Sequence, residues 1–333
     1  MENKILYITQ SGKLSRKDNT LLFENEKIKK VIPIIWLEQI YCLSEISINS
    51  KLLSYLAENK IVVHFFNYYG YYTWSYYPRE SYVSWKLLIE QVRHYENLNK
   101  RLIIAKNIVK WIWKNAIYML YHYKRHWKNV DKYINSIKTL LNEVNFQKDI
   151  FQVLNVEWSI WSIFYESFQQ FLPDIYHINK REKRPPLDPI NALISFGNSV
   201  LYSFVLSKIY LTQLNPTISY LHEPFERRFS LALDLAEAFK FPLVYSVIFN
   251  LINRKILKID KHFERNLNYT LLTNEWRKIF LKFWDKKIKE TFLHPKLKRK
   301  VSYWTYIKLD AYKLIKHLIW EQEFIPFNME NKI

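Results

Sequence analysis

Hydrophobic and polar positions follow two different periods along the chain. Up to about residue 80, short runs of β-branched and aromatic residues are broken at Ser11-Gly12, Asp18-Asn19 and Gly70, a pattern typical of consecutive β-hairpins. One stretch between them, SKLLSYLAEN at 50–59, instead has the spacing of a short helix. We therefore predict a small β-sandwich with one inserted helix over residues 1–80, which Pro78 closes.

From Tyr82 onward, apolar residues recur every three or four positions. The period is clearest over 98–127, 131–145 and 270–291, and it predicts long amphipathic helices. The predicted fold class is therefore α+β, with a small N-terminal β-sandwich domain over residues 1–80 followed by a larger all-α domain over residues 81–333. A chain of 333 residues is long enough for two such domains.

The charge of the chain favours a polyanionic partner. Its 50 Lys and Arg exceed its 31 Asp and Glu by 19, so nucleic acid is the first expectation and an anionic membrane surface the second. An AT-rich genome is an alternative explanation of the charge. It would favour Lys, Ile, Asn and Tyr and leave few glycines, and this chain has only three. Charge alone therefore does not decide. Basic clusters at 180–184 and 296–300 either bind phosphate or form solvated loops.

Other features of the composition exclude whole classes of protein. No continuous apolar run reaches the roughly 18 to 20 residues of a spanning helix, and the N-terminus lacks the apolar core of a secretory signal. We therefore expect a cytoplasmic protein without a membrane segment. The single cysteine, Cys42, excludes an internal disulfide and a zinc site made of several cysteines.

An acidic pair interrupts one of the most apolar predicted helices. Pro224 and Pro242 bracket a helix expected from about Phe225 to Phe239. Within it, Asp234 and Glu237 are three residues apart and so share one face. Two like charges on a mostly buried helix destabilise it unless a cation, a proton or an arginine compensates them.

Two kinds of compensation fit this pair. Hard carboxylate oxygens suit Mg²⁺ or Mn²⁺ and leave positions open for phosphate and water. The alternative is a structural ion pair with Arg227 or Arg228, about two turns upstream. An imidazole from His222, in the turn before the helix, would suit the metal site.

A third carboxylate would complete such a site. Glu157 has almost wholly apolar neighbours in VLNVEWSIWSIFYESFQQFL, at 153–172. Glu166 lies in the same segment and is the competing candidate. Periodicity does not choose between them.

The resemblance to a known family is carried by three segments. They are NVEWSIWSIFYESF at 155–168, KREKRPPLDPINALISFGNSVLY at 180–202 and SYLHEPFERRFSLALDLAEAF at 219–239. In these segments, and along the whole chain, the sequence resembles the Cas-one family, the larger of the universal CRISPR adaptation proteins and a family of DNA integrases. The family pairs a β N-terminal domain with a helical catalytic domain.

The resemblance implies a set of catalytic residues. Glu157 stands where the family has a glutamate that precedes a helix rich in aromatic residues, and Leu221-His222 matches its histidine. Asp234 and Glu237 match the acidic pair. The resemblance thus implies that Glu157, His222 and Asp234 bind Mg²⁺ or Mn²⁺, with Glu237 in support.

The block at 180–202 has features that can be read from its own chemistry. Asp188 is placed to cap a helix that starts near Pro189. We expect Asn191 and Asn198 to be structural. Tyr165, two turns after Glu157, is within reach of the predicted site.

The implied function is DNA integration in CRISPR spacer acquisition. A metal-dependent transesterification would insert short duplexes with free 3′ ends into CRISPR repeat DNA, and hydrolysis of DNA would be a related activity. The implied partners are a second copy of the chain, joined through the β-rich domain, and a smaller protein of the Cas-two family. The alternative is a non-catalytic nucleic-acid-binding protein. In either case, phosphates would be held without base recognition by Lys180, Arg181, Lys183, Arg184, Arg227 and Arg228.

Overall fold

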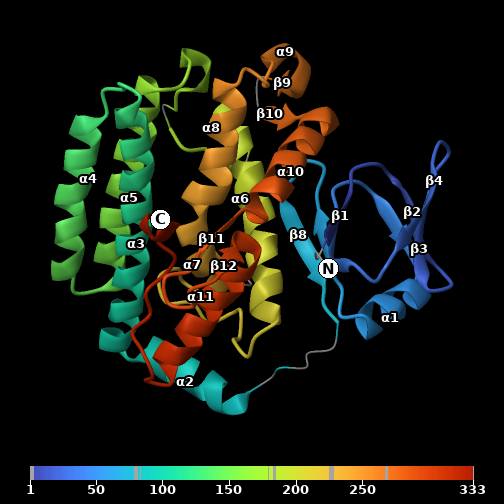
Figure 1. Cartoon of the computed structure of the whole chain (residues 1–333), viewed down its shortest axis with the longest axis horizontal. Coiled ribbons are helices and arrows are strands. Elements are labelled where there is room, and N and C mark those ends of the chain that lie inside the picture. Colours follow the sequence, from blue (N-terminus) through green and yellow to red (C-terminus); the bar gives the residue numbers. More distant parts are fainter. Residues whose placement is uncertain are drawn as a thin grey trace. The chain divides into compact units, whose positions relative to one another are not determined.

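The computed structural model describes residues 4–78, 82, 84–178, 180–182, 185–224, 229–266 and 269–332. The chain forms two compact units. One consists of Met1–Ser81 with Leu272–Leu281, and the other of Tyr82–Leu271 with Lys282–Ile333. The described part is rich in strands in the first unit and in helices in the second (Figure 1).

Two four-stranded sheets make up the first unit. In one, with the order β1-β5-β7-β8, β5 pairs in parallel with both β1 and β7, and β8 is antiparallel to β7. In the other, with the order β4-β3-β2-β6, β2 to β4 form antiparallel pairs and β6 is parallel to β2. The strands are β1 (Lys4–Ile8), β2 (Gly12–Lys17), β3 (Thr20–Glu24), β4 (Lys29–Pro33), β5 (Leu37–Cys42), β6 (Ile46–Ile48), β7 (Val62–Phe66) and β8 (Tyr72–Tyr76).

Both sheets and helix α1 (Ser50–Glu58) contribute to one apolar core. Leu14, Ile40, Leu56 and Val63 are among its fully buried members. The helix lies where the sequence predicts it, and Asn49 caps it by accepting a hydrogen bond from the Leu52 N–H (2.9 Å). The apolar residues that alternate along the strands of the first unit thus form one core between its two sheets.

Two of the three predicted chain reversals are confirmed. Asp18 and Asn19 join β2 to β3, and Gly70, with a φ of 81°, lies between β7 and β8. The break at Ser11-Gly12 is not a hairpin, because β1 and β2 belong to different sheets. A Cβ atom on Gly12 would lie 2.7 Å from the Glu24 carbonyl oxygen. Glycine is therefore needed at the point where the chain changes sheets.

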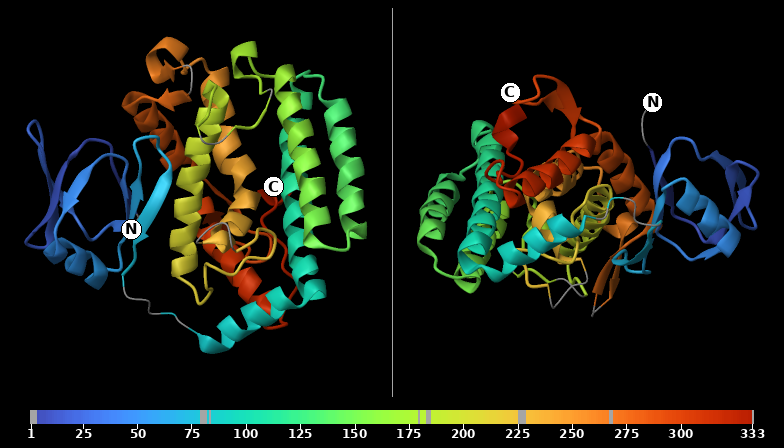
Figure 2. Two further views of the ribbon diagram at one scale, coloured as in Figure 1. Left: turned by 180° about the vertical axis from the view of Figure 1, so that it is seen from behind. Right: turned by 90° about the horizontal axis from the view of Figure 1, so that it is seen from below.

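The second unit is built mainly from helices, as its apolar period predicts. Helices α3, α4 and α5 pack side by side, as Figures 1 and 2 both show. The α-helices are α2 (Trp85–Glu96), α3 (Leu98–Arg125), α4 (Asp131–Glu143), α5 (Ile150–Glu166), α6 (Pro189–Tyr210), α7 (Ser230–Phe239), α8 (Ser246–Asn253), α9 (Ile259–His262), α10 (Asn274–Ile288) and α11 (Tyr303–Leu318). Residues of α10 up to Leu281 belong to the first unit.

The prediction that the second domain is all-α is wrong. Two small two-stranded sheets interrupt it, one of β9 (Phe263–Asn266) with β10 (Tyr269–Leu272), the other of β11 (Thr291–Leu293) with β12 (Lys300–Ser302). These strands have only three or four residues each. Segments this short do not contain enough alternation to be distinguished from the flanking loops.

In the part of the chain that the structure describes, two helical stretches are long and apolar enough to cross a membrane, contrary to the expectation from continuous apolar runs. They are Pro189–Tyr210 and Ser230–Asn253, with mean hydropathies of 1.4 and 1.5. In each, 83% of the apolar window is buried inside the protein. Both stretches therefore serve as core helices of the second unit.

The helix predicted from Phe225 to Phe239 has different limits. Residues 225–228 lie outside the described part, and α7 begins at Ser230 and ends at Phe239 as expected. Pro242 does not end the helical conformation, because α7 is followed by a π-helical turn over Lys240–Tyr245 that continues directly into α8. Proline clashes with the carbonyl four residues earlier in an α-helix, and the wider π turn relieves this clash.

Candidate functional site

The predicted acidic pair lies at the centre of a polar cluster inside the second unit. Asp234 is 2% exposed, and its Oδ2 accepts hydrogen bonds from the N–H groups of Tyr220 (2.7 Å) and Leu221 (3.0 Å). Its Oδ1 accepts from the N–H (3.1 Å) and the ring Nδ1 (2.8 Å) of His222. Four donors therefore stabilise this buried carboxylate and fix the turn that precedes α7.

His222 is oriented by that carboxylate. Since both oxygens of Asp234 act as acceptors, Nδ1 of the imidazole must carry the proton. Burial tends to lower the pKa of His222, but the hydrogen bond to Asp234 and the charges of Asp234, Glu237 and Glu157 together raise it above its ordinary value. The other ring nitrogen, Nε2, is then the one left to bind a ligand.

Glu157 belongs to the same cluster, whereas Glu166 does not. Glu157, on α5, is 8% exposed, and its Oε1 accepts a hydrogen bond from the indole Nε1 of Trp161 (3.2 Å). Burial, and then the charge of Glu237, raise the pKa of the Glu157 carboxyl group above its usual value. Glu166 is exposed at the end of the helix and pairs with Lys132 (3.3 Å).

Glu237 has one paired and one unpaired carboxylate oxygen. Its side chain is 3% exposed, and Oε1 accepts a hydrogen bond from the ammonium group of Lys240. The buried Oε2 has no hydrogen-bond partner among the described residues. Lys240 also lies over the ring of Trp161, 5.2 Å from its centroid. The compensating cation is thus a lysine one turn downstream, which the sequence did not single out.

Aromatic rings fix the position of Trp161. Its indole stacks against Phe241 (centroids 5.5 Å apart) and against Tyr165 (5.4 Å). The hydroxyl groups of Tyr165 and Tyr245 are 3.1 Å apart, and burial raises the pKa of Tyr245 well above its ordinary value. Tyr165 therefore supports Trp161, which donates to Glu157, through its ring and through its contact with Tyr245.

A buried asparagine connects α7 to the C-terminal segment. Nδ2 of Asn115, on α3, donates to the carbonyl groups of Ala238 and Phe327 (both 3.0 Å). Its Oδ1 accepts from the N–H of Met329 (2.7 Å). Asn115 is one of three asparagines in this 28-residue helix, and nothing in the sequence distinguishes it or indicates its partners. Its hydrogen bonds nevertheless hold the end of the helix that carries Glu237.

The four predicted site residues are gathered but are not arranged as a complete ligand set. His222 and Asp234 are in direct contact, whereas Glu157 and Glu237 act on His222 through their charges. In the described ranges, no group of three or more His, Cys, Asp or Glu side chains is positioned to hold a metal ion. Internal hydrogen bonds already use both oxygens of Asp234 and one of Glu237.

The basic residues predicted to bind nucleic acid are only partly described. Lys180 is exposed. The guanidinium group of Arg181 donates to Asn191 Oδ1 (2.7 Å) and Ser195 Oγ (2.9 Å). These bonds tie the segment before α6 to that helix. The remaining four, Lys183, Arg184, Arg227 and Arg228, lie outside the described residues.

The start of α6 agrees with the prediction from its sequence. Pro189 is at the first position of the helix, and Asp188 caps it by accepting from the Asn191 N–H (2.8 Å). The Asn191 side chain donates to the Lys180 carbonyl (2.9 Å) and to Asp188 Oδ2 (2.6 Å). It is therefore a structural residue, as expected.

Comparison with protein families and curated proteins identifies relatives that span nearly the whole chain. The family model described as CRISPR associated protein Cas1 matches residues 6–286. A protein named CRISPR-associated protein Cas1 1, from Methanobrevibacter ruminantium, is 46% identical over 98% of this chain and 99% of its own length. CRISPR-associated endonuclease Cas1 3 from Thermodesulfovibrio yellowstonii is 43% identical over 96% of this chain and 98% of its own length.

Solved structures show the same fold. A Cas1 protein from Thermotoga maritima, 36% identical, superposes with a TM-score of 0.87 and covers 96% of this chain and 98% of its own. A casposase bound to its integration product has a TM-score of 0.87 at 19% identity, over 99% of this chain and 94% of its own. A chain of a Cas6-RT-Cas1–Cas2 complex superposes with a TM-score of 0.85 at 20% sequence identity, and the match covers 98% of this chain and 36% of that chain.

Proposed function

Because the chain belongs to the Cas1 family, we propose that it is the DNA integrase and endonuclease of CRISPR spacer acquisition, acting in the cytoplasm. The observation that carries this proposal is the buried cluster of Glu157, His222, Asp234 and Glu237. Full-length relatives named as endonucleases support the nuclease activity. The likeness in fold to a casposase bound to its integration product is consistent with strand transfer.

The donor chemistry of the cluster fits a divalent cation. The buried Oε2 of Glu237 lacks a partner, and such an orphaned oxygen is destabilising unless a ligand satisfies it. Carboxylate oxygens and an imidazole nitrogen suit Mg²⁺ or Mn²⁺. A bound cation would also offset the two effects that raise the pKa of Glu157, burial and then the repulsion from Glu237. It would polarise a DNA phosphate and stabilise the charge that develops during transfer.

The hydrogen bonds favour a particular division of roles within the cluster. Asp234 directs both oxygens at the turn over 220–222 and so positions the imidazole of His222. The free ring nitrogen of His222, Oε2 of Glu237 and the carboxylate of Glu157 would then hold the cation. This assigns direct binding to Glu237 and positioning to Asp234, the reverse of what the resemblance implied. Lys240 would neutralise Glu237 while the cation is absent.

The proposed reaction is an exchange of phosphodiester bonds. The 3′-hydroxyl group of an incoming strand loses its proton, and its oxygen forms a new bond to a phosphorus atom of the repeat DNA. The bond from that phosphorus to the 3′-oxygen of the repeat strand breaks, and this oxygen takes up a proton. Water in place of the attacking hydroxyl gives hydrolysis instead. Trp161 contributes by holding Glu157 through its indole N–H, so that the carboxylate keeps its direction during the reaction.

The DNA and protein partners belong to the same proposal. The net charge of +19 supports binding to phosphates, for which we propose Lys180, Arg181, Lys183, Arg184, Arg227 and Arg228. The likeness to a chain of a Cas6-RT-Cas1–Cas2 complex supports a Cas2 partner. Tyr68, Tyr69 and Trp74 are exposed in the first unit, and exposed aromatic side chains of this kind support a homodimer formed through it.

A second candidate function is non-catalytic nucleic-acid binding. It is favoured by the pairing of Glu237 with Lys240 and by the four donors around Asp234, which compensate both acids without a metal. In that case, the cluster would be a purely structural network.

An integration assay separates the two functions. Purified protein, its Cas2 partner, a short duplex with free 3′ ends and a repeat-containing plasmid are incubated with Mn²⁺ or with excess EDTA. The integrase should join the duplex to the plasmid only with Mn²⁺, and EDTA should leave DNA binding largely intact. DNA binding without strand transfer or cleavage in Mn²⁺ would instead support the non-catalytic function. Undiminished activity in EDTA would refute metal dependence.

A further inference from the structure

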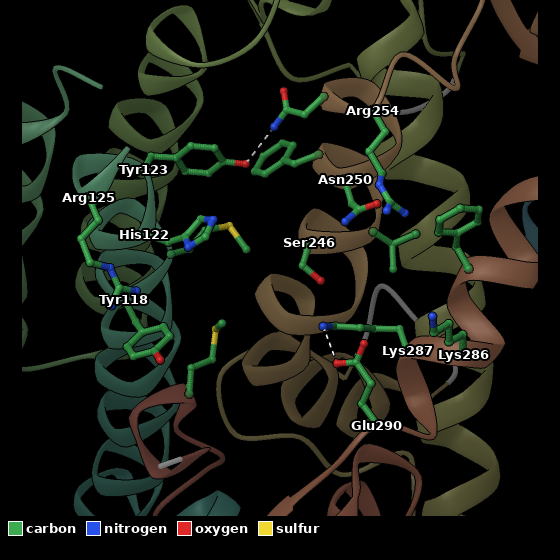
Figure 3. Close-up of a pocket in the computed structure, with 16 residues that line it drawn as sticks. Tyr118, His122, Tyr123, Arg125, Ser246, Asn250, Arg254, Lys286, Lys287 and Glu290 are labelled. Carbon is green, nitrogen blue, oxygen red and sulfur yellow. Dashed lines mark hydrogen bonds and ion pairs between the residues drawn. The ribbon is translucent and has the colours of Figure 1, made fainter. Parts of the chain in front are cut away.

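A cavity of about 550 Å³ lies in the second unit, away from the acidic cluster. Side chains of α3, α8 and α10 border it, as Figure 3 shows. Its volume is within the range of roughly 300 to 1,000 Å³ that small-molecule sites occupy. None of Glu157, His222, Asp234 and Glu237 lines it.

The lining of this cavity is strongly basic. Arg125, Arg254, Lys286 and Lys287 contribute four cations, and Glu290 contributes one carboxylate, which gives a formal charge of +3. Lys287 is paired with Glu290 (2.6 Å). Within the described part of the chain, no ion pair connects Arg125, Arg254 or Lys286 with a carboxylate. Figure 3 shows Arg254 and Lys286 on the α8 and α10 side of the cavity and Arg125 on the α3 side, so cations without a carboxylate partner border it on both sides.

The ends of the three helices explain only part of this charge. Helix α3 ends at Arg125, α8 ends one residue before Arg254, and α10 ends one residue after Lys287. Cations stabilise helix C-termini, each of which carries a partial charge of about −0.5. The three helix ends together carry a partial charge of roughly −1.5, which is half of the +3 of the side chains. The lining of the cavity therefore keeps an excess of positive charge.

The neutral side chains of the cavity narrow the class of ligand. Ser246 and Asn250 project from α8, and Tyr118 and Tyr123 from α3. The hydroxyl group of Tyr123 is 3.5 Å from Nδ2 of Asn253. Guanidinium groups suit phosphate oxygens because they can form two parallel hydrogen bonds. Hydroxyl, amide and aromatic groups nearby suit a sugar and a base.

We propose that this cavity is a second anion-binding site, which takes the phosphate of a nucleotide and needs no divalent cation. The phosphate group could belong to a free mononucleotide or to a nucleotide within a DNA strand, since both carry the same chemical group. The proposal does not rest on the chemistry of the acidic cluster. Measurements in EDTA therefore test it independently of strand transfer.

The test is isothermal titration of the full-length protein in EDTA with dAMP, with inorganic phosphate, and with a single-stranded oligonucleotide that lacks terminal phosphates. Arg254→Gln removes a cation of the cavity, and Asn250→Trp fills the space without changing its charge. Lys282→Gln is the matched control, since Lys282 is an exposed residue of α10 that does not line the cavity. Circular dichroism confirms that each variant is folded.

The wild type should bind dAMP, and inorganic phosphate should compete. Arg254→Gln and Asn250→Trp should each weaken binding about tenfold or more, as expected for the loss of a charge-assisted hydrogen bond or of space. Lys282→Gln should bind like the wild type. If only the oligonucleotide binds and the same two variants weaken it, the site holds and DNA is the source of the phosphate. Absence of binding by both ligands, or equal binding by the cavity variants, overturns the proposal.

Discussion

Asp234 and Glu157 are both buried acids of the proposed cation site, yet replacing the carboxyl group by an amide should destabilise the protein at Asp234 and not at Glu157. In Asp234→Asn, one acceptor oxygen becomes an NH₂ group. If it replaces Oδ2, the N–H groups of Tyr220 and Leu221 lose their acceptor. If it replaces Oδ1, the N–H of His222 loses its acceptor and the imidazole must change its tautomer.

The expected loss can be estimated from these bonds. A hydrogen bond to a charged group contributes about 1.5 to 3 kcal/mol, and the bonds that remain in Asp234→Asn lose the negative charge of their acceptor. We therefore expect Asp234→Asn to destabilise the turn over 220–222 by about 3 kcal/mol, which corresponds to roughly a hundredfold increase in its local opening.

Glu157→Gln is the matched control, since it also removes one carboxylate from the cluster. Burial and the charge of Glu237 raise the pKa of Glu157 in the folded protein. The folded state therefore binds the proton more tightly than the unfolded chain, and ionisation at neutral pH destabilises the fold. Glutamine removes this effect and can still accept the Trp161 hydrogen bond. Stability at pH 7 in EDTA should stay the same or rise.

Amide hydrogen exchange, followed by mass spectrometry in EDTA at pH 7, reads both effects. Peptides that contain Tyr220, Leu221 and His222 should exchange about a hundredfold faster in Asp234→Asn and at the wild-type rate in Glu157→Gln. Urea unfolding should give a lower midpoint for Asp234→Asn alone. If both variants match the wild type in exchange and in midpoint, Asp234 does not position the turn, and the proposed division of roles is wrong.

Three further substitutions test Lys240, Trp161 and His64. Lys240→Met should lower stability without metal and strengthen Mn²⁺ binding, because the ammonium group no longer competes for Glu237; unchanged or weaker binding by calorimetry would count against this role. Trp161→Phe keeps a ring beside Lys240 but removes the N–H donor to Glu157, so strand transfer should slow about tenfold with little change in melting temperature; a wild-type rate would refute the positioning role. Burial lowers the pKa of His64 from 6.5 to about 3, so the unfolded chain takes up a proton below pH 6.5 that the folded state does not. Between pH 7 and 5 the wild type should therefore lose about 2 kcal/mol more stability than His64→Gln, and urea unfolding with the same pH dependence in both proteins would contradict this.

Local patterns in the sequence predict much of the fold, but they do not predict which distant segments pair with one another. The spacing of apolar residues places α3, α4 and α10, because a helix depends on neighbours three and four positions away. The parallel pairing of β1 with β5 joins Lys4 to Leu37. A contact between residues so far apart in sequence leaves no trace in the local alternation, and the chain was therefore expected to continue as hairpins.

Asp234 and Glu237 are visible in the sequence because charged residues are rare on buried helices, whereas the spacing of apolar residues does not separate Glu157 from Glu166, and only the family resemblance favours Glu157. Lys240 and Trp161 cannot be recognised in the sequence, because the chain has 50 basic residues and 12 tryptophans and nothing in the sequence marks these two. Lys240 and Phe241, which stacks on Trp161, lie in the π turn over Lys240–Tyr245, whereas the sequence predicts that Pro242 ends the helix. The proposed roles of Asp234 and Glu237 likewise depend on which carboxylate faces the turn before α7, and sequence spacing alone does not reveal this.

Binding of Mn²⁺ to the purified protein, followed by electron paramagnetic resonance of the free ion, tests most directly whether the buried cluster is a cation site. The wild type should bind Mn²⁺, and Glu157→Gln and Glu237→Gln should each weaken binding at least tenfold, because each removes a charged oxygen ligand. Glu166→Gln, which changes an exposed carboxylate on the same helix as Glu157, should bind like the wild type. Equal binding by all four proteins, or loss of binding only in Glu166→Gln, would contradict the proposed site.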